Sequence, residues 1–596
     1  MIVPMKKAAI ILQAKDTDDA VAKLRRLGVL HIEHQEMPQG KDIASLKDDI
    51  AVITRVIDIL SIPEFSRNRN FRISKHIDDW RLAAHHIADL YSRFDQLQEY
   101  SHRMKNDVTE WERWGDFDPE SVTSLEKKGV FLRLYDIPVK EMSKIPEEVI
   151  LKKCSVSSGI VKCAIVSRKK TELPFKEIPL PKMSLSKMRA RIAEDLSAIH
   201  TIKEDIRKYT QYKDRFVKIR EAFEKELEFH EAKRGMGRSG AITYIVGYIP
   251  YDAAAKLLSK AKAERWGATI SEPSENDLVP TLIRNPRWIS IISPVFRMIG
   301  IVPGYRELDT SMWFLIFFSV FFGMLIGDAG YGIIFFVLTA AAQFKFGYRI
   351  KDKSPFILLY ILSSCAIVWG VLSGTYFGQE WLPQSVKPLV PALRNDKSVQ
   401  SICFFIGALH LTIGRLWRAV LKWPSLDALS DVGWAVILWG GFYLAKLLIL
   451  SEPLPSFAKW LFISGAVLVL FFTSPNKNPL KALAGGAGSL ALNFMNSFTD
   501  VVSYIRLFAV GLATVAVADS FNKMASEVGW SNLIAGLVAS LILVIGHVLN
   551  LLLGPLSIIV HGVRLNVLEF CSHADIKWSG FSYSPLKTKL EDNEKR

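Results

Sequence analysis

The chain has 596 residues, of which 49% are hydrophobic and 23% are charged, and its formal net charge at pH 7 is +15. This length leaves room for two or more domains. A net positive charge can indicate nucleic-acid binding, but no nucleic-acid motif occurs in the chain, and basic residues in membrane proteins usually reflect the positive-inside bias. We therefore expect no nucleic-acid partner.

Several kinds of site are excluded by what the sequence lacks. No P-loop of the form G-x-x-x-x-G-K-[ST] occurs, so the chain is not expected to hydrolyse a nucleotide by itself. Residues 235–240 fit G-x-G-x-x-G, but they follow a predicted helix and precede a predicted strand, the reverse of a dinucleotide-binding fold. The five cysteines are scattered without a C-x-x-C pair, which argues against a zinc site and a disulfide framework. We expect neither a metal nor a cofactor.

The first residues predict a small mixed lobe. In residues 1–40, KAAIILQ and VLHIEH are predicted strands, and TDDAVAKLRRLG between them is a predicted helix that ends at Gly28. We expect this proximal lobe to include residues 275–300. The N-terminus lacks the layout of a signal peptide, and the first half has no apolar run long enough to cross a membrane. It should therefore stay in the cytoplasm.

Two long helical regions follow, separated by a second lobe. Residues 41–115 carry apolar side chains at helical spacing, and residues 183–235 sustain a 3-4 apolar repeat over several heptads. Together they predict an antiparallel coiled coil that carries a distal lobe of residues 116–182 and 236–274. Within that lobe GVFLRLYDI and GIVKCAIVS are predicted strands, and AITYIVGYIP is predicted to return the chain to it.

From Ser311 onward, long apolar runs dominate the sequence, and we expect about eight membrane segments. Their approximate bounds are 311–327, 330–346, 354–377, 399–420, 427–450, 457–474, 484–525 and 531–571. Three basic stretches are predicted as loops on the cytoplasmic side, and an even number of segments also puts the C-terminus there. These loops are Lys345–Lys353, Arg415–Lys422 and Lys477–Lys481.

The expected fold class is thus an α-helical polytopic membrane domain with N-terminal cytoplasmic α+β lobes joined by an antiparallel coiled coil. The cytoplasmic part covers residues 1–300, and the membrane part covers residues 301–596. The last two of about eight transmembrane helices should be long and tilted, because each exceeds the roughly 20 residues that span a hydrocarbon core.

The seventh segment contains an arginine near its centre. A guanidinium close to the bilayer midplane costs at least about 2.5–3.5 kcal/mol. It cannot lose its charge, since arginine stays protonated in proteins. Arg506 therefore requires an anionic partner or water.

Polar residues before this arginine recur at steps of three and four, which puts them on one helical face. A polar stripe that ends in a fixed positive charge indicates half of a path for ions. For Ser489 or Asn493 alone, close helix packing is an equally good explanation. The stripe consists of Ser489, Asn493, Asn496, Asp500, Ser503 and Arg506.

The eighth segment has a similar stripe of polar and small residues, and Glu569 lies a little over one turn beyond its arginine. For His561 alone, packing is the more common role, and Arg564 and Glu569 have snorkelling to the interface as an alternative. The stripe consists of His547, Asn550, Gly554, Ser557, His561 and Arg564.

Stretches of the seventh and eighth segments, together with four other stretches of the chain, resemble a known family. The chain is similar, over nearly its whole length, to the membrane stator subunit of rotary V-type and archaeal-type ATPases, called subunit a or, in prokaryotes, subunit I. The length and compact loops resemble the bacterial or archaeal form. The stretches that carry the resemblance are LRRLGVLHIEH, YIVGYIP, FFGMLIGDAGYG, VWGVLSGTYFG, TDVVSYIRLFAVGLAT and VHGVRLNVLEF.

The resemblance implies that Arg506 faces a rotor ring of proteolipid subunits, that Arg564 is its companion, and that Glu569 and His561 belong to the same ion path. We add Asp500 and Ser503 to the residues of ion translocation. As lining of the half-channels, the aqueous routes from each side of the membrane, we expect Asn493, Asn496, His547 and Asn550. The ion would be a proton or Na⁺.

The resemblance also implies partners and a location. Besides the rotor ring, the partners would be peripheral-stalk subunits, the central-stalk and catalytic subunits of an ATPase complex, and membrane lipid. The chain would be a multi-pass protein of a prokaryotic plasma membrane with both termini in the cytoplasm. It departs from the family pattern at Gly554, where some members have glutamate, at Thr514, where others have histidine, and in the tail CSHADIKWSGFSYSP. These differences leave the outer half of the ion path unassigned.

Two other classes of protein compete with this interpretation. A secondary ion transporter with a regulatory coiled coil would also carry charges at mid-membrane, but it would show internal repeats, and none is found in the sequence. A membrane receptor with a cytoplasmic coiled coil would leave the two intramembrane arginines unexplained.

Overall fold

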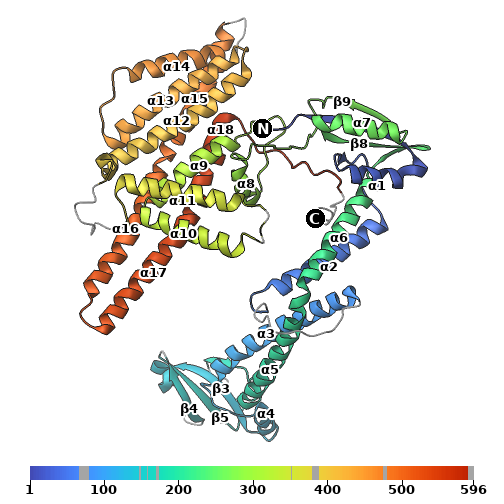
Figure 1. Ribbon diagram of the computed structural model, residues 1–596. Coiled ribbons are helices and arrows are strands. Elements are labelled where there is room, and N and C mark those ends of the chain that lie inside the picture. Colours follow the sequence, from blue (N-terminus) through green and yellow to red (C-terminus); the bar gives the residue numbers. More distant parts are fainter. Residues whose placement is uncertain are drawn as a thin grey trace. The chain divides into compact units, whose positions relative to one another are not determined.

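The computed structural model describes residues 1–65, 79–145, 149–157, 159–169, 174–348, 350, 352–378, 388–473 and 479–587. Its ribbon is drawn in Figure 1. The chain divides into two compact units. Of the described residues, one unit comprises 1–11, 27–33 and 246–587, and the other comprises 12–26 and 34–245.

The N-terminal strand lies in the middle of a sheet whose order is β2-β8-β1-β9, with β7 paired to β8. Every second or third residue of β1 is buried, as expected for a strand with one face on a core. Helices α1 (Thr17–Leu27) and α7 (Ala254–Ala263) accompany it. The strands are β1 (Met5–Gln13), β2 (His31–Glu33), β7 (Gly237–Ser239), β8 (Ile242–Pro250) and β9 (Gly267–Ser271).

This sheet corrects one prediction. The stretch AITYIVGYIP forms β8, which pairs with β2 in the register His31–Tyr248 and lies beside β1. The assignment of residues 236–274 to the distal lobe is therefore wrong, and β8 and β9 belong with the N-terminal strands. Strand propensity marks a segment as a strand without naming its partner, which the buried face and the register decide.

Four helices form the long antiparallel arrangement expected from the heptads. Helix α2 packs on α6, and α3 packs on α5 (Figure 1). Their shared core includes Ile57, Ile87, Ile202, Ile206 and Phe216. The second arm is not one helix, because the short 3-10 turn η3 (Thr210–Tyr212) separates α5 from α6. The helices are α2 (Lys41–Ser61), α3 (Trp80–Trp111), α5 (Leu185–Tyr209) and α6 (Lys213–Arg234).

Between α3 and α5 the chain forms a second sheet of order β4-β5-β3-β6, with antiparallel neighbours. The predicted strands GVFLRLYDI and GIVKCAIVS are confirmed as β3 and β5. Tyr135, Ile137, Cys163 and Ile165 form its core. The elements are α4 (Pro119–Lys127), β3 (Phe131–Pro138), η2 (Val139–Lys144), β4 (Ile150–Ser157), β5 (Ile160–Ser167) and β6 (Lys176–Ile178).

The second half of the chain is helical. Its last helix continues from α17 through two π-helical turns, η7 and η8, into the short α18. The helices are α8 (Ser293–Ile299), α9 (Ser311–Ile326), α10 (Ala329–Phe346), α11 (Ser354–Ser373), α12 (Asp396–Lys422), α13 (Asp427–Leu450), α14 (Ala458–Phe472), α15 (Pro479–Ser503), α16 (Ile505–Val528), α17 (Leu533–Ser557), η7 (Ile558–Gly562), η8 (Leu565–Phe570) and α18 (Cys571–Ala574).

Within the described residues, six helical runs are long and apolar enough to cross a membrane by length and composition. A polytopic membrane domain thus follows the N-terminal α/β region. Helices occupy all eight predicted positions, but α9 and α14 have only 16 and 15 residues. At about 1.5 Å per residue, α9 is roughly 24 Å long, less than a hydrocarbon core. Its C-cap is Gly327, whose φ of +66° suits glycine.

One of the three predicted basic loops is contradicted by the structure. The prediction of a loop at Arg415–Lys422 is wrong, because these residues form the last two turns of α12. Their charges are paired inside the helical domain, as described below, which a count of basic residues cannot reveal. Residues of the other two stretches, Lys345–Lys353 and Lys477–Lys481, lie partly outside the described part of the chain.

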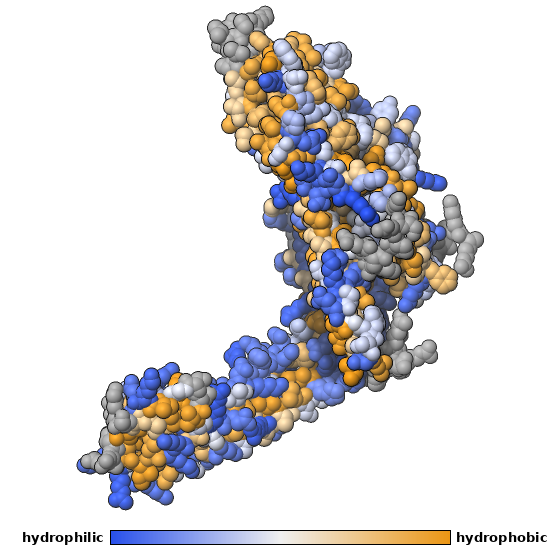
Figure 2. Space-filling model, turned by 90° about the vertical axis from the view of Figure 1, so that its left-hand side faces the viewer, coloured by the Kyte–Doolittle hydropathy of each residue, from blue (hydrophilic) through white to orange (hydrophobic). Residues whose placement is uncertain are grey.

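The surface of the helical domain is strongly apolar in places. Figure 2 shows orange side chains over much of the helical surface that it presents. Along α17 the exposed side chains include Leu533, Ile534, Leu541 and Leu552. Apolar side chains that remain exposed on a long helix suit contact with lipid or with another apolar chain.

The C-terminal tail returns to the N-terminal sheet. The backbone N–H of Thr281 donates to the Phe581 carbonyl at 2.8 Å, and that of Leu586 donates to the Leu30 carbonyl at 3.0 Å. The Tyr583 hydroxyl also donates to the carbonyl of Val29. These backbone contacts join the two ends of the chain within one compact unit.

Candidate functional site

Arg506 lies just after an interruption of the seventh helix. Helix α15 ends at Ser503, Tyr504 forms a turn, and α16 begins at Ile505. The N–H of Leu507 bonds to the Tyr504 carbonyl at 3.0 Å, a three-residue step that tightens the backbone. Arg506 Nη2 then donates to Ser503 Oγ at 2.9 Å across this turn.

The last helix supplies an anion for this arginine. Arg506 Nη2 donates to Glu569 Oε1 at 3.0 Å, and Arg564 Nε lies 3.5 Å from the same oxygen. The side chain of Glu569 is 5% exposed, that of Arg506 is 25% exposed and that of Arg564 is 54% exposed. We call Arg506, Arg564 and Glu569 the arginine–glutamate cluster. Two of its three charges are positive, so the cluster carries a net charge of +1.

The π-helical turns explain why two residues five positions apart can meet. In an α-helix, residues three and four apart share a face, whereas a π-helix bonds residues five apart. The N–H of Val563 bonds to the Ile558 carbonyl in η7. Arg564 immediately precedes the wide turn η8, and Glu569 lies within it. Pro555, which has no N–H, lies just before the first wide turn.

Tyr504 is held by a histidine from another helix. His410 of α12 is fully buried, and its Nδ1 lies 2.8 Å from the Tyr504 hydroxyl. Its ring stacks on Phe317 and Phe570, with centroids 3.9 and 4.4 Å away. A Cβ added at Gly407 would come within 2.7 Å of the Tyr504 ring, so only glycine permits this approach. The turn before Arg506 is thus fixed from α12.

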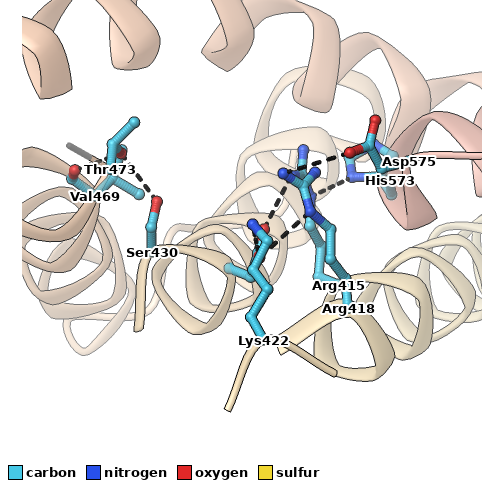
Figure 3. A network of polar contacts seen from close by, with 9 residues as sticks. Arg415, Arg418, Lys422, Ser430, Val469, Thr473, His573 and Asp575 are labelled. Atoms are coloured by element: carbon cyan, nitrogen blue, oxygen red, sulfur yellow. Dashed lines mark hydrogen bonds and ion pairs between the residues drawn. The ribbon is translucent and has the colours of Figure 1, made fainter. Parts of the chain in front are cut away.

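A second polar network lies on the α15 side of the turn. His573 of α18 is buried, its Nε2 lies 3.0 Å from Asp500 Oδ2, and its Nδ1 accepts a hydrogen bond from Arg415 Nε at 3.0 Å. Arg415 Nη1 lies 3.6 Å from Asp431 Oδ1, and Lys422 Nζ donates to Asp431 Oδ2 at 2.7 Å. Figure 3 shows Arg415 pointing towards His573.

Arg418 extends this network, with Nε 3.4 Å from Asp431 Oδ2 and Nη2 3.8 Å from Asp575 Oδ2. The cations and Asp431 line a polar pocket of about 260 Å³, together with Asn493 of α15 and Ser572 of α18. Ser430 and Thr473, bonded to each other at 2.9 Å, complete the wall (Figure 3).

The remaining predicted residues divide into two groups. Asn493 and Asn496 are exposed on α15, and Asn493 borders the polar pocket. His547 Nδ1 lies 2.7 Å from the Tyr331 hydroxyl of α10, and Asn550 Nδ2 donates to the Thr514 carbonyl at 2.8 Å. His561 is half-buried one turn before Arg564. In the described part of the chain, it has no hydrogen bond or ion pair with the arginine–glutamate cluster.

Several residues of this site were not predicted from the sequence. His410 and Asp431 interrupt apolar helices, and an ionisable residue inside an apolar helix is itself a signal of function. In the sequence, His573 stands out only as part of a tail that departs from the family pattern. Arg415 belongs to a basic stretch whose sequence predicts a loop. Among the described residues, no group of three or more His, Cys, Asp or Glu side chains has the arrangement of a metal site.

No family model matches the chain. V-type ATP synthase subunit I 1 of Treponema pallidum is 28% identical over 632 residues, which covers 99% of this chain and 100% of that protein. V-type ATP synthase subunit I of Borreliella burgdorferi is 29% identical, with 98% and 99% covered. A-type ATP synthase subunit I of Pyrococcus horikoshii is 27% identical, with 68% and 64% covered.

Among solved structures, a crystal structure of the cytoplasmic N-terminal domain of subunit I, the homologue of subunit a of V-ATPase, matches 44% of this chain and 99% of that one. The identity is 13% and the TM-score is 0.22, which does not establish a common fold. The similarity in sequence extends over nearly the full length of both bacterial relatives. The chain is therefore a homologue of subunit I, the stator subunit of bacterial V-type and archaeal A-type ATP synthases.

Proposed function

We propose that this chain forms the ion path of a rotary ATPase against a rotor ring of proteolipid subunits. Its relatives are named as subunits of ATP synthases, and this chain contains no P-loop, so nucleotide chemistry would belong to other subunits of the complex. The transported ion is a proton or Na⁺.

The observation that carries the proposal is the charge of the arginine–glutamate cluster. Glu569 compensates only one of the two arginines, and both arginines are partly exposed. A carboxylate on a passing rotor subunit would compensate the other. Arg506 attracts such a carboxylate when it is empty and disfavours the ion-loaded, neutral form.

Two routes to this interface are required, one from each side of the membrane. We assign Asp500 and Ser503, with Asn493, Asn496 and the polar pocket, to the route on the α15 side. We assign His547, Asn550 and His561 to the opposite route. Arg506 lies between the two groups along the chain, so it would keep the routes apart. Each rotor site would then exchange its ion with one side before the other.

The cytoplasmic part would hold the peripheral-stalk subunits against the torque of the rotor. Its antiparallel helices offer a long, stiff lever with a charged surface. This role needs residues 1–300 in the cytoplasm, and with an even number of spans the C-terminus would lie there as well. For a prokaryotic protein the membrane would be the plasma membrane.

Purification of the chain from its native membranes tests this proposal. A proteolipid ring and ATP-hydrolysing subunits should co-purify with an affinity-tagged chain. The isolated complex, reconstituted in vesicles, should couple ATP hydrolysis to ion uptake. A chain that is isolated alone and moves ions without ATP would instead support a secondary transporter. Measuring ion movement by the purified material with and without ATP separates these two functions.

A further inference from the structure

We propose that Arg415 and His573 are positioning residues, which together hold Asp500 as a carboxylate that faces the ion path. This inference rests on the proposed function, because it gives Asp500 a task only in ion transfer. It adds two residues, one from α12 and one from α18, to a path predicted on α15, α16, α17 and the two π-helical turns that follow α17.

The first argument comes from the direction of the hydrogen bonds. Arginine has only donors, so the Arg415 Nε–H that points at His573 Nδ1 needs a lone pair there. A neutral imidazole with a lone pair on Nδ1 carries its hydrogen on Nε2. That N–H therefore points at Asp500 Oδ2, 3.0 Å away, which must accept it.

Burial makes this arrangement stable. The side chain of His573 is 2% exposed, and the side chain of Arg415 is 12% exposed. A second proton on Nδ1 would face the guanidinium directly, donor against donor and cation against cation. His573 is thus kept in one neutral tautomer, in the way that a partner on one ring nitrogen sets the role of the other.

Charge balance supports a negative Asp500. Three cations converge in this network, namely Arg415, Arg418 and Lys422. Asp431 and Asp575 provide two negative charges. Asp500, reached through His573, provides the third, so three cations meet three carboxylates. A protonated Asp500 would leave a buried positive charge without compensation, which is costly.

Asp500 nevertheless remains accessible. Its side chain is 25% exposed, although its Oδ2 is engaged by His573. It lies six residues, less than two turns, before Arg506 on the predicted polar stripe. Asp500 can therefore attract a cation without moving, since its orientation is fixed from behind by His573 and Arg415.

Substitutions at His573 test the inference in the intact ATPase complex. His573→Gln retains an amide N–H for Asp500 and a carbonyl oxygen for Arg415, whereas His573→Phe retains a flat aromatic ring and loses both bonds. We expect His573→Gln to keep at least half of the wild-type ratio of ions moved to ATP hydrolysed. His573→Phe should lose at least tenfold, with unchanged amounts of assembled complex. Lys577→Gln, at an exposed side chain four residues further along the chain and outside this network, is the matched control and should behave as wild type.

Three results would overturn the inference. Normal transport by His573→Phe would show that the hydrogen bonds do not matter. Equal losses in His573→Gln and His573→Phe would show that the imidazole itself is needed, as in a proton relay. Loss in Lys577→Gln as well would indicate a general disturbance of this end of the chain. Arg506→Ala in the same vesicles separates the two proposals, because normal transport by that variant would refute the ion path itself.

Discussion

At the scale of single residues, the position of Arg506 depends on how closely Tyr504 approaches α12. Gly407 allows that approach, since a Cβ there would overlap the Tyr504 ring at 2.7 Å. Gly407→Ala should therefore displace the turn before Arg506, at an overpacking cost of about 1–3 kcal/mol. We expect a lower melting temperature of the purified complex and slower ion transport. Gly488→Ala on α15, where nothing lies within 4 Å, is the matched control. Equal behaviour of the two variants would contradict this role of Gly407.

Glu569 offers a second test at this scale. Glu569→Gln removes the negative charge shared by Arg506 and Arg564 and leaves two like charges close together. Ion uptake in vesicles should fall at least tenfold, while the amount of assembled complex stays the same, because a glutamine of similar size fills the site. The control is Glu527→Gln, an exposed carboxylate on α16. If Glu569→Gln transports normally, or if only assembly is lost, the residue has a packing role.

The charged residues of the site could be predicted from the sequence only in part. Arg506, Arg564 and Glu569 stood out because charges in apolar helices are rare. Their mutual contact could not be predicted, since a spacing of five residues puts Arg564 and Glu569 on different faces of a regular helix. The bonds of Asp500 depend on His573 and Arg415, which are distant in sequence and carry no local signal of their meeting.

At the scale of elements, the antiparallel helices depend on a continuous apolar seam. Ile202 and Ile206 of α5 are 8% and 0% exposed in that seam. Replacing both by aspartate buries two unpaired charges, so each change should cost at least about 3 kcal/mol. The full-length protein in detergent should then be cut faster by protease within α2, α3, α5 and α6.

The matched control for this change is Leu196→Asp, because Leu196 lies on the same helix and is 44% exposed. It should leave the rate of proteolysis unchanged. Equal resistance of the double variant and the control would mean that α5 does not pack as described. In the assembled complex, the double variant should also hydrolyse ATP with less ion transport, if these helices hold the peripheral stalks.

The periodicity of the sequence predicts the helices and strands themselves, but it does not predict which of them pack or pair with one another. Heptads mark α5 and α6 but not the 3-10 turn between them. Alternating residues mark β8, yet its neighbours β1 and β2 lie more than 200 residues away in the sequence. Local pattern determines secondary structure, and long-range pairing depends on surfaces that the pattern does not specify.

At the scale of the whole molecule, the N-terminal sheet gives the chain a dependence on pH that is separate from ion transport. Lys7 Nζ donates to Asp277 Oδ1 at 2.8 Å, and this hydrogen bond holds the pKa of Asp277 below its usual value. An unfolded aspartate titrates near pH 3.9. The pair therefore stabilises the fold fully above about that pH, and its contribution disappears as the pH falls through the lower value of the folded state.

Asp277→Asn removes this contribution. Its melting temperature should lie below that of the wild type at pH 7, and the two should converge as the pH is lowered towards about 3. Glu275→Gln, at an exposed carboxylate nearby, should show no such convergence. Thermal unfolding followed at several pH values makes the comparison. A constant difference between Asp277→Asn and wild type at every pH would contradict the assigned ion pair.

The central claim is that Arg506 is the fixed charge between two ion routes in a complex with a rotor. The most direct measurement is the ratio of ions taken up to ATP hydrolysed by vesicles that contain the complete complex with Arg506→Ala. The account predicts a ratio below a tenth of the wild-type value, with all subunits present in normal amounts. A complex that carries Arg506→Ala and still moves ions at the wild-type ratio would contradict it.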